Sequence, residues 1–545
     1  MGDLGGRLKA WTARSAMAGA ALLAMAATAH ADEAGCKALS GRPIAAAEIG
    51  LPTSGAKVTS AALVAAQPGT PAYCKILGAI APVDRTAPPI LFQLNLPEAW
   101  NKKAVQMGGG GLNGTVVNGL GRPNDSPPDS PLPLALGYAT FGSDSGHGQG
   151  KPDMGVFAWN AEALDNYLKG AIKKTRDTAV ALAAAYYGEA PRRVYYFGRS
   201  QGGREAMNAA QNFPADYDGI VAIVPVIGWS GLESHAYTQW EGAYANDWAG
   251  RPKPVHLKLI KDAILAACDG ADGLKDGVVS NYLACKGPDL ATLRCRDGKA
   301  ADDCLTTPQL ALVRRVHAPL KYGFTAANGA TEYPGWPWGA GETLVEGPAP
   351  WMAVKGEVDN TKFLDQSRGN IGVAFARYFL VRDPGFSKPL VLKDYEAAFK
   401  YVSARADMTN PDRSAFAARG GKLLMKENWA DYSQNPVRGL NYYKAVVAKM
   451  GQPKVDGFMR LYVNPGVDHG GSGEMGDGTP APEKVDWLGA LDAWVEKGEA
   501  PPPLTVTAYQ GNKPGAARPL CRYPLHPHYD GKGDPNLAAS FACKP

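Results

Sequence analysis

Residues 198–202 have the sequence Gly-Arg-Ser-Gln-Gly, in which Ser200 stands between two glycines at the spacing G-x-S-x-G. The β-branched and aromatic run at 193–197 predicts a strand before it, and residues 205–213 predict a helix after it. In such a turn the glycines let strand and helix approach closely, and the serine hydroxyl is exposed at the helix N-terminus. This context favours a nucleophilic serine over a plain β–α turn.

A nucleophilic serine requires a general base and an acid that orients it, and in this type of fold the chain order is serine, acid, histidine. His469 stands in a glycine-bounded loop after a late predicted strand, where such a fold presents its base. Asp431 follows another predicted strand and is our choice for the acid. Asp468 is the direct neighbour of His469 and is poorly placed to reach that ring, and Glu427 is a third choice. The other histidines downstream of the serine lie in a segment of different character or in a proline-rich tail: His235, His256, His317, His526 and His528.

Acyl transfer also requires N–H donors for the negative charge that develops on the carbonyl oxygen. The backbone N–H of Gln201 is one donor by the geometry of a nucleophile elbow. Four glycines at 108–111 follow another predicted strand, and we expect Gly110 and Gly111 to supply the second donor. A phosphate cradle is the alternative for such a run, but no Gly-Lys-Ser/Thr sequence follows it.

Short apolar strands alternate with helical segments in two blocks of the chain, which predicts an α/β fold with a mostly parallel sheet. The predicted strands are 89–96, 104–107, 138–141, 193–197, 219–225, 421–425 and 459–463. Between the blocks, residues 228–410 are rich in tryptophan, tyrosine and Gly-Pro turns and show little strand pattern. We therefore predict a catalytic domain formed by 32–227 and 411–545, with 228–410 inserted into it.

The N-terminal residues 1–31 have the pattern of a secretory signal, with three basic residues, an apolar run and Ala-His-Ala at 29–31. The apolar run is shorter than the roughly 20 residues that a membrane span needs. We therefore expect an exported protein, periplasmic or secreted, without a membrane anchor. The chain has 57 basic and 52 acidic residues and no basic stripe, which argues against a nucleic-acid partner.

Eight cysteines follow the predicted signal, and an even number in an exported chain favours disulfide bonds over free thiols or a metal site. No two of them have the C-x-x-C spacing that is typical of zinc sites. Sequence alone leaves other pairings open, but pairing of neighbours gives the simplest set: Cys36–Cys74, Cys268–Cys285, Cys295–Cys304 and Cys521–Cys543.

Five stretches of the chain resemble the tannase and feruloyl esterase family of α/β-hydrolases. They are Gly-Gly-Gly-Gly-Leu-Asn-Gly at 108–114, Ser-Asp-Ser-Gly-His at 143–147, Gly-Arg-Ser-Gln-Gly-Gly-Arg-Glu at 198–205, Phe-Pro-Ala-Asp-Tyr-Asp-Gly-Ile at 213–220 and Trp-Ala-Asp at 429–431. The resemblance implies an α/β-hydrolase fold with a large lid inserted between the nucleophile and the acid. It also implies a serine esterase that cleaves galloyl, feruloyl or terephthaloyl esters, small aromatic substrates, through an acyl-enzyme.

Two other functions stay open on the sequence. The same triad suits a lactone, an aliphatic ester or a transacylase reaction, because a fold does not fix a substrate. The family usually has disulfide-bonded cysteines directly before the serine and directly after the histidine, whereas this chain has Arg199 and Gly470. A non-catalytic ligand-binding protein is therefore the second alternative. Without that bridge we expect Ser200 and His469 to be held in register by packing alone.

Residues 268–278 place three aspartates among glycines, and hard oxygen ligands on a tight loop suit Ca²⁺. The spacing is not that of an EF-hand, and from the residues alone a solvated turn explains the pattern equally well. The family's lid binds Ca²⁺ in a matching loop, which implies a structural ion in this chain. By that resemblance its ligands are the side chains of Asp269, Asp272 and Asp276 and the carbonyls of Leu274 and Val278.

Aromatic side chains in the insertion offer an apolar slot for a planar acyl group, although each one taken alone is more typical of a lid core. They are Trp229, Tyr237, Trp240, Trp336, Trp338, Trp351, Phe375, Tyr378 and Phe379. Arg368 and Arg377 are weaker candidates for contact with a substrate carboxylate. No redox cofactor is implied.

Overall fold

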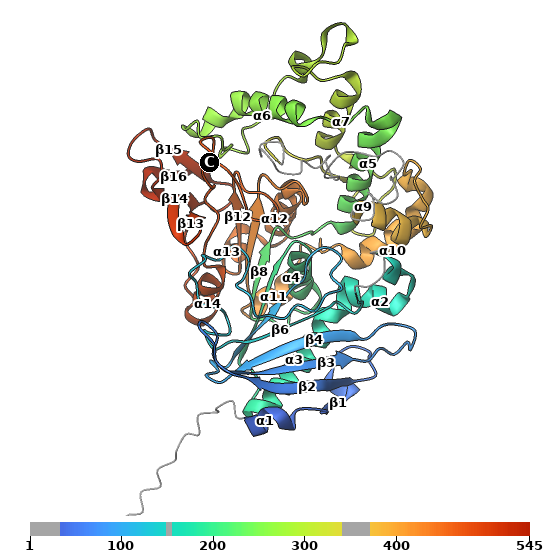
Figure 1. The fold of residues 1–545 in the computed structure, drawn as a ribbon, viewed down its shortest axis with the longest axis vertical. Helices are drawn as coiled ribbons and strands as arrows, with labels where there is room; N and C mark the ends of the chain where they lie inside the picture. The colour runs from blue at the N-terminus through green and yellow to red at the C-terminus, as the bar shows by residue number, and fades with distance from the viewer. Residues whose placement is uncertain (1–32, 149–154, 341–370) are drawn as a thin grey trace, which may run out of the picture.

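The computed structural model describes residues 33–148, 155–340 and 371–545, so the predicted signal at 1–31 lies outside the described residues. A ten-stranded mixed sheet forms the centre of the molecule (Figure 1). In spatial order its strands are β1 (Pro43–Ile44), β2 (Ala56–Val64), β3 (Tyr73–Ile80), β4 (Ile90–Pro97), β6 (Ala139–Ser143), β5 (Lys103–Met107), β7 (Arg193–Arg199), β8 (Gly219–Ile223), β11 (Lys422–Asn428) and β12 (Met459–Asn464). The strands from β6 to β12 pair in parallel, and those from β1 to β6 pair antiparallel.

Each of the seven strands predicted from the sequence is present, and the predicted α/β fold is confirmed. The sequence analysis missed β1, β2 and β3, which form the antiparallel side of the sheet. Part of the surface of β2 and β3 is exposed, so polar residues interrupt their apolar pattern. A strand with one solvent-exposed face has a shorter apolar run than a buried parallel strand, so the sequence predicts it less clearly.

Helices cover both faces of the parallel strands. In β7 the side chains of Tyr195 and Phe197 join one core with Trp487 of α14 (Trp487–Lys497), while Tyr196 joins another core with Met207 of α4 (Gln201–Asn212). Successive side chains of a strand point to opposite faces, so each strand is held from both sides. The carboxyl ends of these strands are thereby fixed, and an active site built on them has a rigid base.

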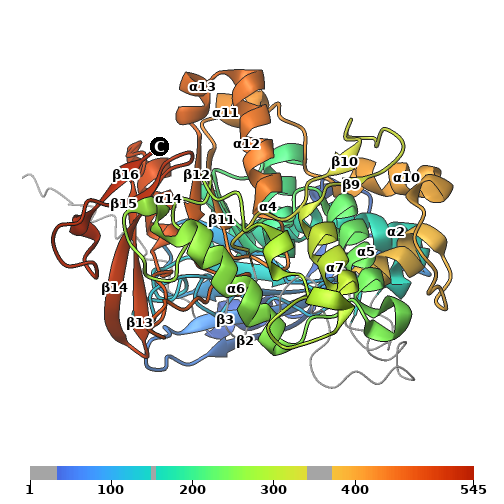
Figure 2. The same cartoon turned by 90° about the horizontal axis from the view of Figure 1, so that it is seen from above.

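The insertion lies between β8 and β11 in the chain. Its long helices are α5 (Trp229–Trp248), α6 (Pro254–Cys268), α7 (Thr307–His317) and α10 (Glu396–Ala406). The described part of 228–410 adds no strand to the large sheet and forms only the short pair β9 (Leu320–Lys321) and β10 (Glu332–Tyr333). Its buried side chains form an apolar core together with Leu112, Val226 and several residues of 157–168. In Figure 2 helices α5, α7 and α10 lie on the opposite flank from the C-terminal strands.

The C-terminal segment forms two antiparallel ribbons that the sequence analysis missed: β13 (Leu504–Gln510) with β14 (Lys513–Leu520), and β15 (His526–Tyr529) with β16 (Phe541–Lys544). All four disulfide bonds expected from neighbour pairing are present, and Cys521–Cys543 lies in this segment. None of the helices in the described ranges is long and apolar enough to span a membrane.

Candidate active site

Ser200 occupies a strained turn between β7 and α4. Its backbone angles are φ 58° and ψ −119°, outside the regions that side-chain-bearing residues usually adopt. The strand ends at the residue before it and the helix begins at the residue after it. A Cβ atom on Gly202 would lie 2.8 Å from the carbonyl oxygen of Gly109, so this glycine permits the elbow to contact the glycine loop. The strand–turn–helix geometry predicted for the serine is present.

Ser200, His469 and Asp431 form a continuous hydrogen-bonded chain. The Nε2 atom of His469 lies 2.8 Å from the Oγ of Ser200, and its Nδ1 lies 2.8 Å from Oδ2 of Asp431. Oδ1 of Asp431 accepts hydrogen bonds of 2.7 Å from the backbone N–H groups of Ser433 and Gln434. A carboxylate beside Nδ1 places the ring proton there, which leaves Nε2 free to accept the serine proton. The geometry is that of a nucleophile, a base and an orienting acid.

The two other acid candidates are engaged elsewhere. Oδ1 of Asp468 accepts a hydrogen bond from the N–H of Ser472, so this carboxylate stabilises the turn of the histidine loop in which both residues lie. The Glu427 carboxylate is buried and accepts from the Nε2 group of Gln434, and burial raises its pKa well above the usual range. Neither of these carboxylates forms a described hydrogen bond with the ring of His469. The described contacts therefore give the role of acid to Asp431 alone.

The glycine loop at 108–111 packs against the elbow, as the sequence analysis expected. The N–H of Gly109 is already used, because it donates to Oε2 of Glu205 at 3.2 Å. Within the described part of the chain, the N–H groups of Gly110 and Gly111 donate no hydrogen bond. A Cβ atom on Gly110 would meet nothing within 4 Å, so the loop faces open space at this point. Gly110, Gly111 and Gln201 thus remain the candidates for the oxyanion hole.

Buried Glu205 holds this loop in place. Its carboxylate also accepts from the hydroxyls of Tyr196, at 2.8 Å, and Ser145, at 3.1 Å. Replacing Glu205 with glutamine puts an NH₂ group where one of these donors points. We expect the loop to shift and kcat to fall by about 10-fold, a part of what the loss of an oxyanion donor costs. The exposed Glu189→Gln is the matched control in the same steady-state assay. An unchanged kcat for Glu205→Gln would show that the loop is held without this carboxylate.

A sequence model of the tannase and feruloyl esterase family matches residues 74–544, a span that includes the triad and the glycine loop. The chain belongs to this family. The resemblance seen in the sequence is therefore confirmed, and the protein is a carboxylic ester hydrolase rather than a non-catalytic binding protein.

Similar proteins in this family are esterases. The chain is 37% identical over 528 residues to an uncharacterised esterase of Agrobacterium fabrum, covering 93% of this chain and 92% of that protein. It is 31% identical over 528 residues to the mono(2-hydroxyethyl) terephthalate hydrolase of Piscinibacter sakaiensis, covering 87% and 85%. The crystal structure of feruloyl esterase B from Aspergillus oryzae superposes with a TM-score of 0.76 at 22% identity, covering 94% of this chain and all of that one. The last comparison establishes the fold.

The insertion contacts the triad from above the sheet. Nε1 of Trp336 donates to the backbone carbonyl of Asp431 at 3.2 Å, and the side chain of Ile371 approaches Gly111. The rings of Phe375 and Phe379 each lie 5.1 Å from that of Trp229, centroid to centroid, inside the lid core. Through Trp336 and Ile371 the insertion, which is the predicted lid, therefore reaches the acid loop and the glycine loop.

Of the two arginine candidates for a substrate carboxylate, Arg368 lies outside the described residues, as does Trp351 of the aromatic set. Arg377 is buried, and its Nε donates to the carbonyl of Phe386 at 2.9 Å. This bond ties two segments of the lid together. The structure gives Arg377 a role in lid packing, and no described contact joins it to the triad.

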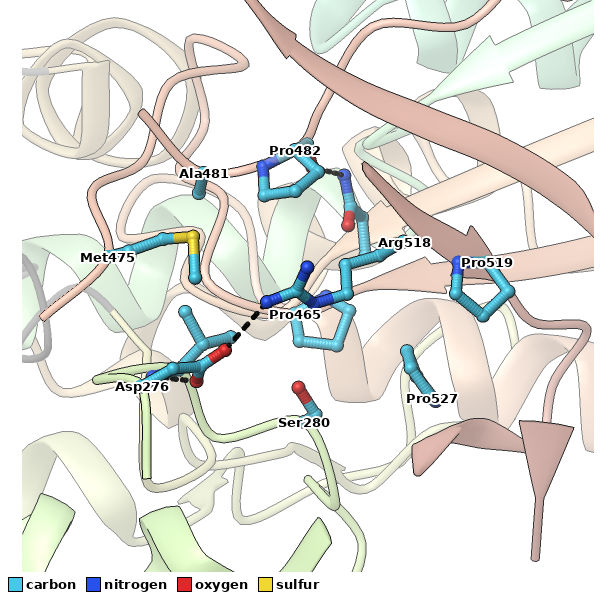
Figure 3. A pocket seen from close by; sticks show the side chains of 11 residues that line it. Asp276, Ser280, Pro465, Met475, Ala481, Pro482, Arg518, Pro519 and Pro527 are labelled. Atoms are coloured by element: carbon cyan, nitrogen blue, oxygen red, sulfur yellow. Dashed lines mark hydrogen bonds and ion pairs between the residues drawn. The ribbon is translucent and has the colours of Figure 1, made fainter. Parts of the chain in front are cut away.

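The predicted calcium loop follows α6 and is secured by the Cys268–Cys285 disulfide bond. Oδ1 of Asp269 is buried without a hydrogen-bond partner, and burial raises the pKa of Asp272 to about 6. Asp276 instead forms an ion pair of 3.1 Å with Arg518, beside a water-sized cavity of about 20 Å³ (Figure 3). In the described ranges, no three His, Cys, Asp or Glu side chains converge as a metal site. The site thus offers two desolvated carboxylates, which suit a cation, rather than the three that were expected.

One expectation from the sequence is wrong. Packing alone does not hold Ser200 and His469 in register, because Arg199 donates a hydrogen bond to the carbonyl of Gly470 and forms an ion pair with Asp125. The sequence analysis missed Asp125, which stands in a proline- and serine-rich loop between β5 and β6 and belongs to no motif. The substitution of both family cysteines was the only sequence signal at this place.

Proposed function

We propose that this protein is an exported serine esterase that cleaves esters of aromatic carboxylic acids through an acyl-enzyme. The observation that supports it most is the pair of 2.8 Å contacts from His469 to Ser200 and Asp431. Nucleophile, base and orienting acid within hydrogen-bond reach are the arrangement that acyl transfer requires.

Ser200 Oγ attacks the ester carbonyl while Nε2 of His469 takes its proton. The carbonyl oxygen becomes an oxyanion, which the N–H groups of Gln201 and of Gly110 or Gly111 stabilise. The tetrahedral intermediate collapses, the imidazolium gives its proton to the leaving alcohol, and an ester of Ser200 remains. Water then repeats the two steps and releases the acid. Asp431 orients the ring of His469 and stabilises the imidazolium throughout.

The acyl group is inferred from chemistry that similar proteins share. Terephthaloyl and feruloyl groups, named in two of them, are both planar aromatic acids. The core of the lid beside Gly111 and Asp431 contains many aromatic side chains, a residue type that stacks favourably on such rings. A planar aromatic acyl group therefore suits this lid better than a flexible aliphatic one.

A panel of esters tests this specificity. We expect hydrolysis of at least one of methyl gallate, methyl ferulate and mono(2-hydroxyethyl) terephthalate. Between p-nitrophenyl benzoate and p-nitrophenyl butyrate, which share a leaving group, we expect kcat/KM to favour the benzoate by about 10-fold or more. A preference for the butyrate, with no hydrolysis of the three aromatic esters, would instead favour an aliphatic esterase.

We further propose a structural Ca²⁺ held by the carboxylates of Asp269 and Asp272 with the carbonyls of Leu274 and Val278. The unpartnered Oδ1 of Asp269 supports it, because burial of a carboxylate oxygen that accepts no hydrogen bond is costly unless a cation pairs with it. The ion would brace the loop between α6 and Cys285 and would take no part in the chemistry.

Chelation tests the calcium proposal. We expect EGTA to lower the midpoint of thermal unfolding by about 5 °C, since a ligand that binds only the folded state stabilises it by mass action. Asp272→Asn should unfold at the lower temperature with or without EGTA, whereas the exposed Asp302→Asn should behave like the wild type. Calorimetry measures both. If the midpoint of thermal unfolding is the same with EGTA, with added Ca²⁺ and with neither, a stabilising ion is ruled out.

A further inference from the structure

Arg199 links the serine strand to the histidine loop. It is the last residue of β7, directly before Ser200, and its side chain is only 14% exposed. One guanidinium nitrogen, Nη1, donates to the backbone carbonyl of Gly470, the residue after the base. The other, Nη2, pairs with Oδ1 of Asp125. A single side chain of the serine strand thus contacts both the histidine loop, at Gly470, and the loop that carries Asp125.

Asp125 extends this contact to the strand that precedes the acid. Its Oδ2 lies 2.8 Å from Nζ of Lys426 in β11, and both side chains are fully buried. Lys426 stands five residues before Asp431. The backbone carbonyl of Asp125 also accepts from the N–H of Val485 at 2.8 Å. One carboxylate therefore contacts basic side chains from both strands whose ends carry the nucleophile and the acid.

The backbone around this cluster leaves no spare room. Gly471 has φ 79°, and a Cβ atom there would lie 2.4 Å from Oδ1 of Asp125 and 2.5 Å from Nη2 of Arg199. Any larger residue at this position must displace the ion pair or the histidine loop. The loop and the ion pair therefore fit each other only with glycine at 471.

The guanidinium of Arg199 stays charged although it is largely buried. Burial lowers the pKa of Arg199, and the carboxylates of Glu483, Asp431 and Asp468 offset that effect. A guanidinium remains protonated in proteins and its fork makes two directed hydrogen bonds at once, which an ammonium does not. Buried charge-assisted bonds of this kind fix a geometry, because removing one partner leaves a buried charge unpaired.

We propose that Arg199 and Asp125 form a polar clamp that positions His469 against Ser200. This inference rests on the proposed roles of those two residues. Arg199 and Asp125 touch no reacting atom, so they are positioning residues. The clamp acts on kcat, since a displacement of about 1 Å between base and nucleophile can cost about 100-fold in rate.

The first test removes the guanidinium. For Arg199→Met we expect kcat to fall by about 10- to 100-fold with KM changed less than about 3-fold. The rate of labelling by a fluorophosphonate should fall by the same factor, because it reports proton transfer from serine to histidine. Arg199→Lys keeps the charge but not the fork, and its loss should be smaller. Arg413→Met removes another buried arginine, which is remote from the triad, and should lower thermal stability without lowering kcat.

A second variant breaks the clamp from the other side and does not depend on whether Arg199→Met folds. Gly471→Ala should lower kcat and the labelling rate as Arg199→Met does. Gly420→Ala is its matched control, because Gly420 has φ 85° and open space around its Cβ position. The double variant of Arg199 and Gly471 should be no slower than the slower single variant, since both changes break one contact.

Two results would overturn the clamp: a wild-type kcat and labelling rate in both Arg199→Met and Gly471→Ala, or fully additive losses in the double variant. A fall in thermal stability alone would mean that the cluster is merely structural. Ser200→Ala separates this failure from failure of the proposed function. Labelling and hydrolysis that persist in Ser200→Ala would contradict the triad itself, whatever the clamp variants show.

Discussion

The Ser200→Ala variant is expected to hydrolyse esters about 10⁵- to 10⁶-fold more slowly than the wild type, with KM little changed. The substitution removes the hydroxyl that His469 activates, because Nε2 of His469 is hydrogen-bonded to that oxygen. The residual rate would come from the oxyanion donors and from substrate binding, which the substitution leaves in place. Fluorophosphonate labelling should disappear altogether, since it needs the nucleophile.

The control for this variant is a serine near the site that the mechanism does not use. Ser433 donates its backbone N–H, not its side chain, to Asp431, so Ser433→Ala keeps that hydrogen bond. It should label and hydrolyse like the wild type. Loss of activity in both variants would point to a disturbed loop rather than to a missing nucleophile. Intact circular dichroism and an unchanged unfolding temperature for Ser200→Ala complete the comparison.

The triad could be predicted from the sequence because each member follows a buried parallel strand. The strands β7, β11 and β12 read as apolar runs, and parallel strands bring their carboxyl ends to one edge of the sheet. Residues in the loops after those strands must then lie close together. Chain order and loop type were enough to select Ser200, Asp431 and His469 from many candidates.

The clamp could not be predicted in the same way. Asp125 comes from a long loop between two strands, and no sequence pattern predicts its path. Lys426 is the residue directly after the predicted strand 421–425, and only the structure extends β11 over it and buries its side chain. The role of Gly109 was hidden for a similar reason, because Glu205 reaches it from the helix behind the serine. Contacts between a loop and a remote strand depend on side-chain direction in three dimensions. The ribbons β13–β14 and β15–β16 were missed because prolines stand inside β14 and β15 and interrupt the strand pattern there.

Replacing Asp431 with asparagine should lower kcat by about 10⁴-fold without unfolding the protein. An asparagine at this position can keep the hydrogen bonds from Ser433 and Gln434 through its oxygen, but it presents an NH₂ group to Nδ1 of His469. The imidazole must then carry its proton on Nε2, the wrong tautomer for a base that has to accept the serine proton. The loss should appear in kcat, and fluorophosphonate labelling should slow by a similar factor.

The same measurement on the two rejected acids decides the assignment. Asp468→Asn replaces a carboxylate that accepts a hydrogen bond within its own loop, and Glu427→Gln replaces one that accepts from Gln434 and whose pKa burial raises. Each should retain kcat within about 10-fold of the wild type, because neither carboxylate contacts the ring of His469. If Asp468→Asn instead lost as much activity as Asp431→Asn, Asp468 would be as important to the base as Asp431, and the assignment of the acid to Asp431 alone would be wrong. The 2.8 Å contact from Nδ1 to Oδ2 of Asp431, with that carboxylate fully buried, is the reason to expect the opposite.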